Sequence, residues 1–507
     1  MGIRGGGDVE DGRPDDDRLR LVRGALFVAL AGAVVGLAVA FHWLGWSSIP
    51  GGSCGSAYSP CPEGTTPTLI LAFVLTFTGL PLAVAMVAAL KRVRPGRTLP
   101  MVLLALGALS AAWPGKQFYL WLRGPVLDVA WDTPVDRPNT VAGVGNWVLD
   151  GAVVRVRTDG LIAYDPRDGA GRWTLDAPVR ASVCAMSDTV SQGVAVIGFG
   201  RHEAPCDTVW GVDVDSGRKL WERKIDAGDR TGSTADGRLA ADGATAVALE
   251  STSVRGLALR EGTPKWRTPM GKECSPRLAS SSDGVTRVLV ECVKDYAFQS
   301  VDLVTLDSAT GAVKSRKKLP VESEIAGARV ISAEPFTLWL KEADERGVNA
   351  VTSYDAQGAE RTSLRLTRPD EDLVVGDDTD AFAVRPALLT AVVGDTLVAT
   401  TRKPGAAEAT MVAGYSLSDG RRLWHTTMGS RVNALTVLGA EKAAVFTEQQ
   451  RVVTIDVRTG SKDDGVPVRE AGDRISDRPQ LVRTPDGWIF VNAVGTGGVP
   501  PAIAVRR

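Results

Sequence analysis

The 507-residue sequence has few histidines, no excess of either charge and no two adjacent cysteines. The formal net charge of −1 leaves no basic face for a nucleic acid, so composition excludes DNA or RNA binding. The three histidines, His42, His202 and His425, are far apart, and no zinc-ligand spacing joins them to cysteines. We therefore predict no nucleic-acid partner and no zinc enzyme.

Acidic residues gather in one stretch that contains Glu371, Asp372, Asp377, Asp378 and Asp380. Carboxylate oxygens at such spacing can bind Ca²⁺. The same composition is typical of a solvated loop, which is the interpretation we favour. We predict no metal site.

Long apolar runs are present only near the N-terminus. Residues 24–46 carry no Lys, Arg, Asp or Glu and would form a helix of about 34 Å, enough to cross a bilayer. Residues 67–90 form a second run, and 99–122 a third that ends in aromatic residues. We expect a disordered cytoplasmic tail over 1–21 and three transmembrane helices within 22–123.

The basic residues indicate a direction. Arg18, Arg20 and Arg23 precede the first run, and the connection over 91–97 is basic, whereas residues 47–66 have no Lys or Arg. By the positive-inside rule the N-terminus is cytoplasmic and residues 124–507 are extracytoplasmic.

All six cysteines lie on segments that this direction places outside. An even number in an oxidising compartment predicts pairing, and proximity in the sequence suggests the bridges Cys54–Cys61, Cys184–Cys206 and Cys274–Cys292. The alternative is that the cysteines are small buried apolar residues.

Beyond residue 125 one pattern recurs: an apolar strand, a turn that ends in Gly, and a Trp four residues later. The turn Asp accepts backbone hydrogen bonds, the Gly supplies a positive φ, and the Trp offers a flat surface for packing between sheets. The repeat residues are Asp165, Gly169, Trp173, Asp213, Gly217, Trp221, Gly262, Trp266, Asp307, Gly311, Gly420, Trp424, Asp456 and Gly460. A seventh copy, which ends at Gly358, is one residue shorter in its turn.

The repeat glycines follow one another at intervals of 40 to 62 residues, a period typical of propeller blades. The pattern resembles the tryptophan-docking repeat of the pyrroloquinoline-quinone-type (PQQ-like) β-propellers, with the full Asp, Gly and Trp set in the first two copies. The resemblance covers roughly residues 126–507 and implies an all-β propeller. Members of that family include quinoprotein dehydrogenases and scaffold proteins without a cofactor, such as the lipoprotein of the outer-membrane barrel-assembly machine.

The two ends of this region complete each other. Residues 126–131 have the pattern of an outer Trp strand with no blade before it, and the final strands, 488–491 and 502–505, lack an outer strand. Seven internal copies and one blade shared by both ends predict eight blades. Seven blades is the alternative.

The resemblance does not bring a visible active site. Many quinoprotein dehydrogenases carry two adjacent cysteines and long insertions, and eight blades in about 380 residues leave little beyond the sheets. We therefore expect no catalytic, cofactor or metal site. The predicted function is a membrane-anchored, extracytoplasmic scaffold that binds a protein or cell-envelope ligand; the alternative is a PQQ-dependent membrane dehydrogenase.

Overall fold

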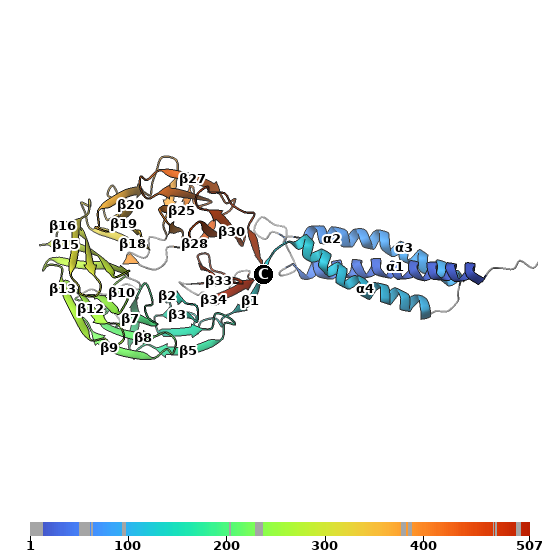
Figure 1. Cartoon of the computed structure of the whole chain (residues 1–507), viewed down its shortest axis with the longest axis horizontal. Helices are drawn as coiled ribbons and strands as arrows, with labels where there is room; N and C mark the ends of the chain where they lie inside the picture. The colour runs from blue at the N-terminus through green and yellow to red at the C-terminus, as the bar shows by residue number, and fades with distance from the viewer. Residues whose placement is uncertain are drawn as a thin grey trace, which may run out of the picture. The chain divides into compact units, whose positions relative to one another are not determined.

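The computed structural model of the chain describes residues 14–49, 61, 64–93, 98–201, 204–228, 237–376, 382–383, 388–469, 471, 474–492 and 498–507. The chain divides into two compact units, a helical one over Met1–Val126 and a β-sheet one over Leu127–Arg507 (Figure 1).

Helix α1 (Pro14–Ser47) begins inside the segment that the sequence suggested was a disordered tail. That expectation is wrong for residues 14–21, and residues 1–13 lie outside the described part of the chain. The sequence contains a helix start, because proline is favoured at the first helical position and acidic residues are favoured in the first turn. Pro14 and the three aspartates after it provide both features.

The second apolar run forms one helical path with an irregular turn in the middle. α2 (Thr65–Val74), the π-helical turn η2 (Leu75–Gly79) and α3 (Leu80–Val93) follow one another directly. Pro81 lacks a backbone N–H and so removes one hydrogen bond from this region of the helix. The Thr76 hydroxyl donates to the Ala72 carbonyl at 2.8 Å and also lies 3.1 Å from His42 Nε2 of α1.

The third helix, α4 (Thr98–Arg123), contains Pro114. By length and mean hydropathy, two stretches of the described residues are long and apolar enough to cross a membrane, Val22–Ser47 and Thr65–Ala88. α4 is not one of them, so the expectation of three spans is met for two helices only. Lys116 and Arg123 make the second half of α4 more polar than the other two stretches.

Small residues bring α1 and α4 close together. A Cβ atom on Gly32 would overlap the backbone carbonyl of Leu104, and one on Gly36 would overlap that of Ala108. Gly107 of α4 is in the same position against Ala29 of α1. Such close backbone approach is typical of helix pairs in which small residues are spaced four apart.

The second unit is built from antiparallel sheets whose strands follow one another in chain order. Four sheets have four strands each. Their strands are β2 (Gly143–Val148), β3 (Val153–Arg157), β4 (Gly160–Tyr164), β5 (Gly171–Asp176), β6 (Ala181–Met186), β7 (Val194–Arg201), β8 (Thr208–Asp213), β9 (Lys219–Lys224), β10 (Leu239–Asp242), β11 (Thr245–Leu249), β12 (Ser253–Ala258), β13 (Pro264–Pro269), β14 (Cys274–Ser282), β15 (Val285–Lys294), β16 (Ala297–Asp307) and β17 (Val313–Lys318).

The two sheets that follow are less regular. They contain β18 (Ile325–Ala333), β19 (Phe336–Glu342), β20 (Asn349–Tyr354), β21 (Glu360–Arg365), β22 (Asp372–Val374), β23 (Phe382–Ala383), β24 (Thr390–Val393), β25 (Thr396–Arg402), β26 (Met411–Ser416) and β27 (Arg422–Thr427). β23 pairs in parallel with β18 at the edge of the first of these sheets, and β22 and β24 both pair with β25 in the second.

The last sheet has eight strands because the parallel pair β1–β31 joins two groups of four. Its strands are β28 (Val432–Val437), β29 (Lys442–Thr447), β30 (Arg451–Asp456), β31 (Val466–Arg469), β32 (Gln480–Arg483), β33 (Gly487–Val491), β34 (Ala502–Arg506) and β1 (Leu127–Asp132). Figure 1 shows the sheets arranged around a ring, with β1 beside the red C-terminal strand β34. The β unit is therefore a propeller.

The ring is closed by strands from both ends of the β unit. β1 pairs with β34 in antiparallel register, with Val129 opposite Val505 and Trp131 opposite Ala504. The Thr133 hydroxyl then accepts a hydrogen bond from the Ala502 amide at 3.0 Å. The predicted pairing of the two ends is confirmed, with residues 128–132 opposite 503–506. Closure leaves neither strand as an open sheet edge.

The hydrophobic core is divided into clusters between neighbouring sheets. One cluster contains Val154 and Leu161 of the β2–β5 sheet together with Ile197 and Phe199 of the β6–β9 sheet. Another contains Trp131 and Val153 and so joins the closing strands to the first regular sheet. Each sheet is thus stabilised by burying both of its faces against neighbours.

Candidate functional site

The tryptophans of the repeat bind the next sheet along the chain. Each indole N–H donates to a backbone carbonyl there: Trp173 to Val214 at 3.0 Å, Trp221 to Leu259 at 2.7 Å, Trp266 to Ser308 at 3.1 Å and Trp424 to Val457 at 2.6 Å. Trp221 and Trp424 are buried, whereas Trp173 and Trp266 are half-buried. These side chains are therefore occupied in packing between sheets.

The repeat glycines form the other half of these contacts. Gly262 has φ +66°, and a Cβ atom there would lie only 2.5 Å from the ring of Trp221. The same ring lies against Gly211 of its own sheet, so the indole fits between two glycines. Further pairs repeat the contact from one sheet to the next: Trp131 with Gly169, Trp173 with Gly217, Trp266 with Gly311 and Trp424 with Gly460.

Two of the repeat glycines, Gly358 and Gly420, face smaller side chains of the preceding sheet. A Cβ atom on Gly358 would lie 3.5 Å from the hydroxyl of Ser315, the residue at the Trp position of the preceding sheet. Gly420 faces Thr362 and Leu364. Smaller side chains therefore cover these glycines in place of an indole.

The repeat aspartates close the turns. The Asp213 carboxylate accepts from the Ser216 amide at 3.0 Å, that of Asp307 from Thr310 at 3.0 Å, and that of Asp456 from Thr459 at 2.9 Å. The carboxylate of Asp165 accepts from the Arg167 amide at 2.9 Å. Hydrogen bonds from Ser216 hold the pKa of Asp213 below its ordinary value, and those from Arg167 do the same for Asp165. These carboxylates are turn residues in this structure, as the pattern predicts.

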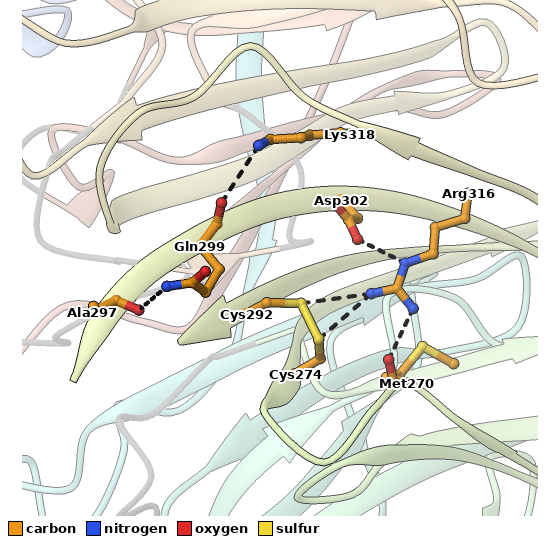
Figure 2. Close-up of a disulfide and its surroundings, with 8 residues drawn as sticks. All are labelled: Met270, Cys274, Cys292, Ala297, Gln299, Asp302, Arg316 and Lys318. Atoms are coloured by element: carbon orange, nitrogen blue, oxygen red, sulfur yellow. Dashed lines mark hydrogen bonds and ion pairs between the residues drawn. A yellow bond between two sulfur atoms is a disulfide. The ribbon is translucent and has the colours of Figure 1, made fainter. Parts of the chain in front are cut away.

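Two of the three predicted disulfides are formed, Cys184–Cys206 and Cys274–Cys292. Cys54 lies outside the described residues, so the bridge Cys54–Cys61 stays a prediction. Figure 2 shows Cys274–Cys292 between β14 and β15, where the two residues are directly opposite each other in the sheet. The guanidinium of Arg316 points at this bridge.

The other residues considered for chemistry do not come together. Among the described residues, no group of three or more His, Cys, Asp or Glu side chains is placed to hold a metal ion. His425 is exposed on β27, and His42 is in α1. His202 and the acidic residues Asp377, Asp378 and Asp380 lie outside the described part of the chain.

Sequence reasoning missed a polar cavity of about 280 Å³ between strands β18–β20, strands β22 and β25, and the segment before β32. Its lining includes Arg329 of β18, Asp372 of β22 and Arg402 of β25, together with Arg478, Trp339 and Asn349. The Trp339 indole donates to Asn349 Oδ1 at 2.9 Å, and Arg402 Nε lies 3.5 Å from Asp372 Oδ2. Guanidinium groups suit carboxylate or phosphate oxygens, so this cavity is the candidate ligand site. No pattern in the sequence could have found it, because its residues come from strands far apart in the chain.

A second missed feature is a carboxyl group that joins two sheets that are not neighbours. Asp188, which follows β6, accepts a hydrogen bond from the Ser280 hydroxyl of β14 at 3.2 Å. The Thr189 amide also donates to this carboxyl at 2.9 Å. Removal from water raises the pKa of Asp188 to about 7, because burial disfavours the charged form.

The third missed feature is a buried ion cluster at the closure of the ring. The carboxylate of Asp136 lies 3.4 Å from Arg155 Nη2 and 3.2 Å from Arg157 Nη1, and all three side chains are buried. Arg155 also donates to the carbonyl of Asn492 at 3.0 Å. Burial lowers the pKa of Arg155, while Asp136 opposes that shift. The cluster connects the segment after β1, strand β3 and the segment after β33.

The fold and the repeat contacts define a β-propeller whose sheets are joined by Trp–Gly contacts. Residues 128–362 match the model of the family described as outer membrane protein assembly factor BamB. This match supports PQQ-like repeats over residues 128–362 of the propeller. No curated protein matches the chain.

Several solved structures resemble the propeller. The computationally designed Ika8 protein is 14% identical, with 76% of this chain and 99% of that chain covered and a TM-score of 0.46. BamB from Moraxella catarrhalis is 13% identical, with 75% and 97% covered and a TM-score of 0.44. The quinohemoprotein alcohol dehydrogenase ADHIIG from Pseudomonas putida HK5 is 11% identical, with 75% and 75% covered and a TM-score of 0.45.

Proposed function

We propose that this chain is a membrane-anchored binding protein whose propeller lies outside the cytoplasm and holds a protein or cell-envelope ligand. The observation that carries the proposal is the combination of a closed propeller, whose repeat residues serve packing, with a helical unit that turns its large apolar side chains outward. The propeller provides a rigid binding surface, and the helical unit provides a membrane anchor.

The membrane anchor is supported by the surface of the helical unit. Large apolar side chains are exposed on all three helical paths: Leu26, Leu30, Val39, Trp43, Ile70, Phe77, Val84, Met101, Leu106, Leu109 and Trp113. Soluble helices place such residues against a core, whereas lipid tails cover them in a membrane. The lipid bilayer is accordingly the first partner that we propose.

We place α4 in the membrane with the other two helical paths. It packs against Gly32 and Gly36 of α1, and its opposite side carries the exposed residues Leu106, Leu109 and Trp113. Three crossings from a cytoplasmic N-terminus bring Leu127–Arg507 to the outside. The disulfides Cys184–Cys206 and Cys274–Cys292 support the same side, since such bonds persist in oxidising compartments.

We propose eight blades for the propeller. The eight-stranded sheet contains two groups of four, β28–β31 and β32–β34 with β1, which only the short parallel pair β1–β31 joins. The core clusters between sheets support the count, because one of them lies between these two groups and contains Phe446 and Phe490. A single eight-stranded blade would not need that buried layer within it.

A binding role is favoured over quinone chemistry by the sequence, which has no two adjacent cysteines and short connections between strands. Purified full-length protein mixed with pyrroloquinoline quinone and Ca²⁺ should keep no quinone absorbance after gel filtration. Stoichiometric retention of the quinone would favour the dehydrogenase instead.

The partner can be captured by cross-linking the intact protein in its own membrane and identifying the products by mass spectrometry. If the partner binds at the polar cavity, the Arg402→Ala variant should lack a cross-linked product that wild type gives. Arg421→Ala is the matched control, because Arg421 is exposed and pairs only with its neighbour Asp419 at 2.5 Å in the described structure. An identical set of products from wild type and from Arg402→Ala would exclude this cavity as the binding site.

A further inference from the structure

The two disulfides of the propeller have different surroundings. Arg316 of β17 holds its guanidinium beside Cys274–Cys292, with Nη2 at 3.6 Å from both sulfur atoms (Figure 2). Nε binds Asp302 at 2.7 Å, and Nη1 donates to the carbonyl of Met270 at 2.8 Å. All three nitrogens are therefore used, which fixes the group in its place against the sulfurs.

Cys184–Cys206 lies instead in an apolar cluster with residues such as Val196 and Leu239. Its two cysteines are 9% and 3% exposed. Among the described side chains, none donates a hydrogen bond to either sulfur. Burial in these apolar surroundings disfavours a thiolate at this bridge.

We propose that Cys274–Cys292 is a thiol-exchange site that a dithiol opens while the propeller stays folded, with Arg316 as the residue that stabilises the departing thiolate. The substrate class is a small dithiol or a protein that carries two neighbouring thiols. Cys184–Cys206 is, by contrast, a structural bond that such a reagent leaves intact in the folded protein.

Access to the sulfurs determines which one is attacked. Cys274 is half-buried and follows the exposed residues Gly271, Lys272 and Glu273, whereas Cys292 is 6% exposed. An incoming thiolate therefore reaches Cys274 Sγ first, and Cys292 Sγ becomes the leaving group. The guanidinium gains little from the neutral disulfide but forms an ion pair with the thiolate, so it favours the broken bond.

The exchange has two steps. A thiolate of the dithiol bonds to Cys274 Sγ, the sulfur–sulfur bond breaks, and its electron pair leaves on Cys292 as a thiolate beside Arg316. The second thiol of the reagent, after losing its proton to water, attacks the sulfur of the reagent in the mixed disulfide. Cys274 leaves as a thiolate, the reagent becomes a cyclic disulfide, and two electrons have passed to the protein.

The test uses purified full-length protein in detergent, treated with dithiothreitol under native conditions. Free thiols are trapped with an alkylating reagent at successive times and assigned by peptide mass spectrometry. In wild type, Cys274 and Cys292 should become labelled while Cys184 and Cys206 stay paired. In Arg316→Gln, the labelling of Cys274 and Cys292 should be about three- to tenfold slower, because a neighbouring positive charge lowers the pKa of the leaving thiol and speeds its departure.

Two variants separate this role from simple packing. Arg316→Lys keeps a positive charge and should stay within about twofold of the wild-type rate. Arg267→Gln is the matched control, since Arg267 is five residues after the repeat Gly262, as Arg316 is after Gly311, yet it binds Glu250 at 2.6 Å. Its loss should leave the rate at Cys274–Cys292 unchanged.

The proposal is overturned if both disulfides open together, or if Arg316→Gln reacts as fast as wild type. Equal slowing by Arg316→Gln and Arg267→Gln would also contradict it, because that result indicates a general change in the sheet. If Arg316→Gln fails to fold, the order of opening in wild type and the rate of Arg316→Lys still decide the question.

Discussion

The contact between Trp221 and Gly262 predicts how the propeller should respond to one added methyl group. Gly262 has φ +66°, and a Cβ atom there would lie 2.5 Å from the Trp221 ring. Gly284 has a similar φ of +75°, but nothing lies within 4 Å of its Cβ position. Gly262→Ala and Gly284→Ala therefore change the backbone preference in the same way, and only the first adds a steric overlap.

The magnitudes follow from these two effects. Alanine in the left-handed region costs about 1 to 2 kcal/mol, which applies to both variants. Overpacking adds about 1 to 3 kcal/mol, which applies to Gly262→Ala alone. With an unfolding entropy of about 2.1 cal/mol/K per residue, a unit of about 380 residues loses roughly 1.2 °C of Tm per kcal/mol. We expect a Tm lower by about 2 to 6 °C for Gly262→Ala and by about 1 to 2 °C for Gly284→Ala.

Thermal unfolding of the full-length protein, followed by tryptophan fluorescence, measures these shifts. The decisive comparison is made in a Trp221→Ala background, where the ring is absent. There the further effect of Gly262→Ala should fall to that of Gly284→Ala, because neighbouring changes are not additive when they share one contact. Equal effects of the two glycine changes in wild type, or full additivity with Trp221→Ala, would refute the docking of Trp221 on Gly262.

Other parts of the propeller give three further predictions. Asp136→Asn should lower the free energy of unfolding by about 3 to 5 kcal/mol in urea titrations, since it leaves Arg155 buried without its carboxylate. Asp419→Asn, which breaks the exposed pair with Arg421, should not change the free energy of unfolding measurably. Equal losses of stability in the two variants would contradict a role for burial. Because the pKa of Asp188 is raised to about 7, the folded state binds a proton that the unfolded carboxyl releases above about pH 4, so Tm should rise as the pH falls from about 8 to about 5. Asp188→Asn should abolish that rise, and a variant whose Tm still depends on pH as in wild type would contradict the role of Asp188. Deletion of residues 498–507, which include β34, should destabilise the whole ring in one transition, whereas loss of protection from proteolysis at β1 alone would argue against closure.

The local repeat could be predicted from the sequence because each copy uses residues within about ten positions of one another. The turn at Asp213 and Gly217 and the position of Trp221 follow from that spacing. The partners of Trp221 are harder to predict from one copy alone, since Leu259 and Gly262 belong to the next copy. Closure was predictable because each end of the β unit has a pattern that is incomplete by itself.

The remaining features could not be predicted, because they join residues with no periodic relation. Asp136 lies in the segment after β1, whereas Arg155 is in β3. Asp188 follows β6 and accepts a hydrogen bond from Ser280 of β14, which is two sheets further along the chain. The contact of Arg316 with the Cys274–Cys292 bridge depends on four strands, β14 to β17, lying side by side. The start of α1 at Pro14 is hard to recognise in the sequence, because a charged first turn has the same composition as a disordered tail.

The side of the membrane on which the propeller lies is the central claim, and a reporter fused after Arg507 tests it most directly. A phosphatase that is active only outside the cytoplasm should be active in this fusion in living cells. A fluorescent protein that matures only in the cytoplasm should stay dark at the same position. The reverse pair of results, a silent phosphatase and a bright fluorescent protein with both fusions present at full length, would contradict the proposed orientation.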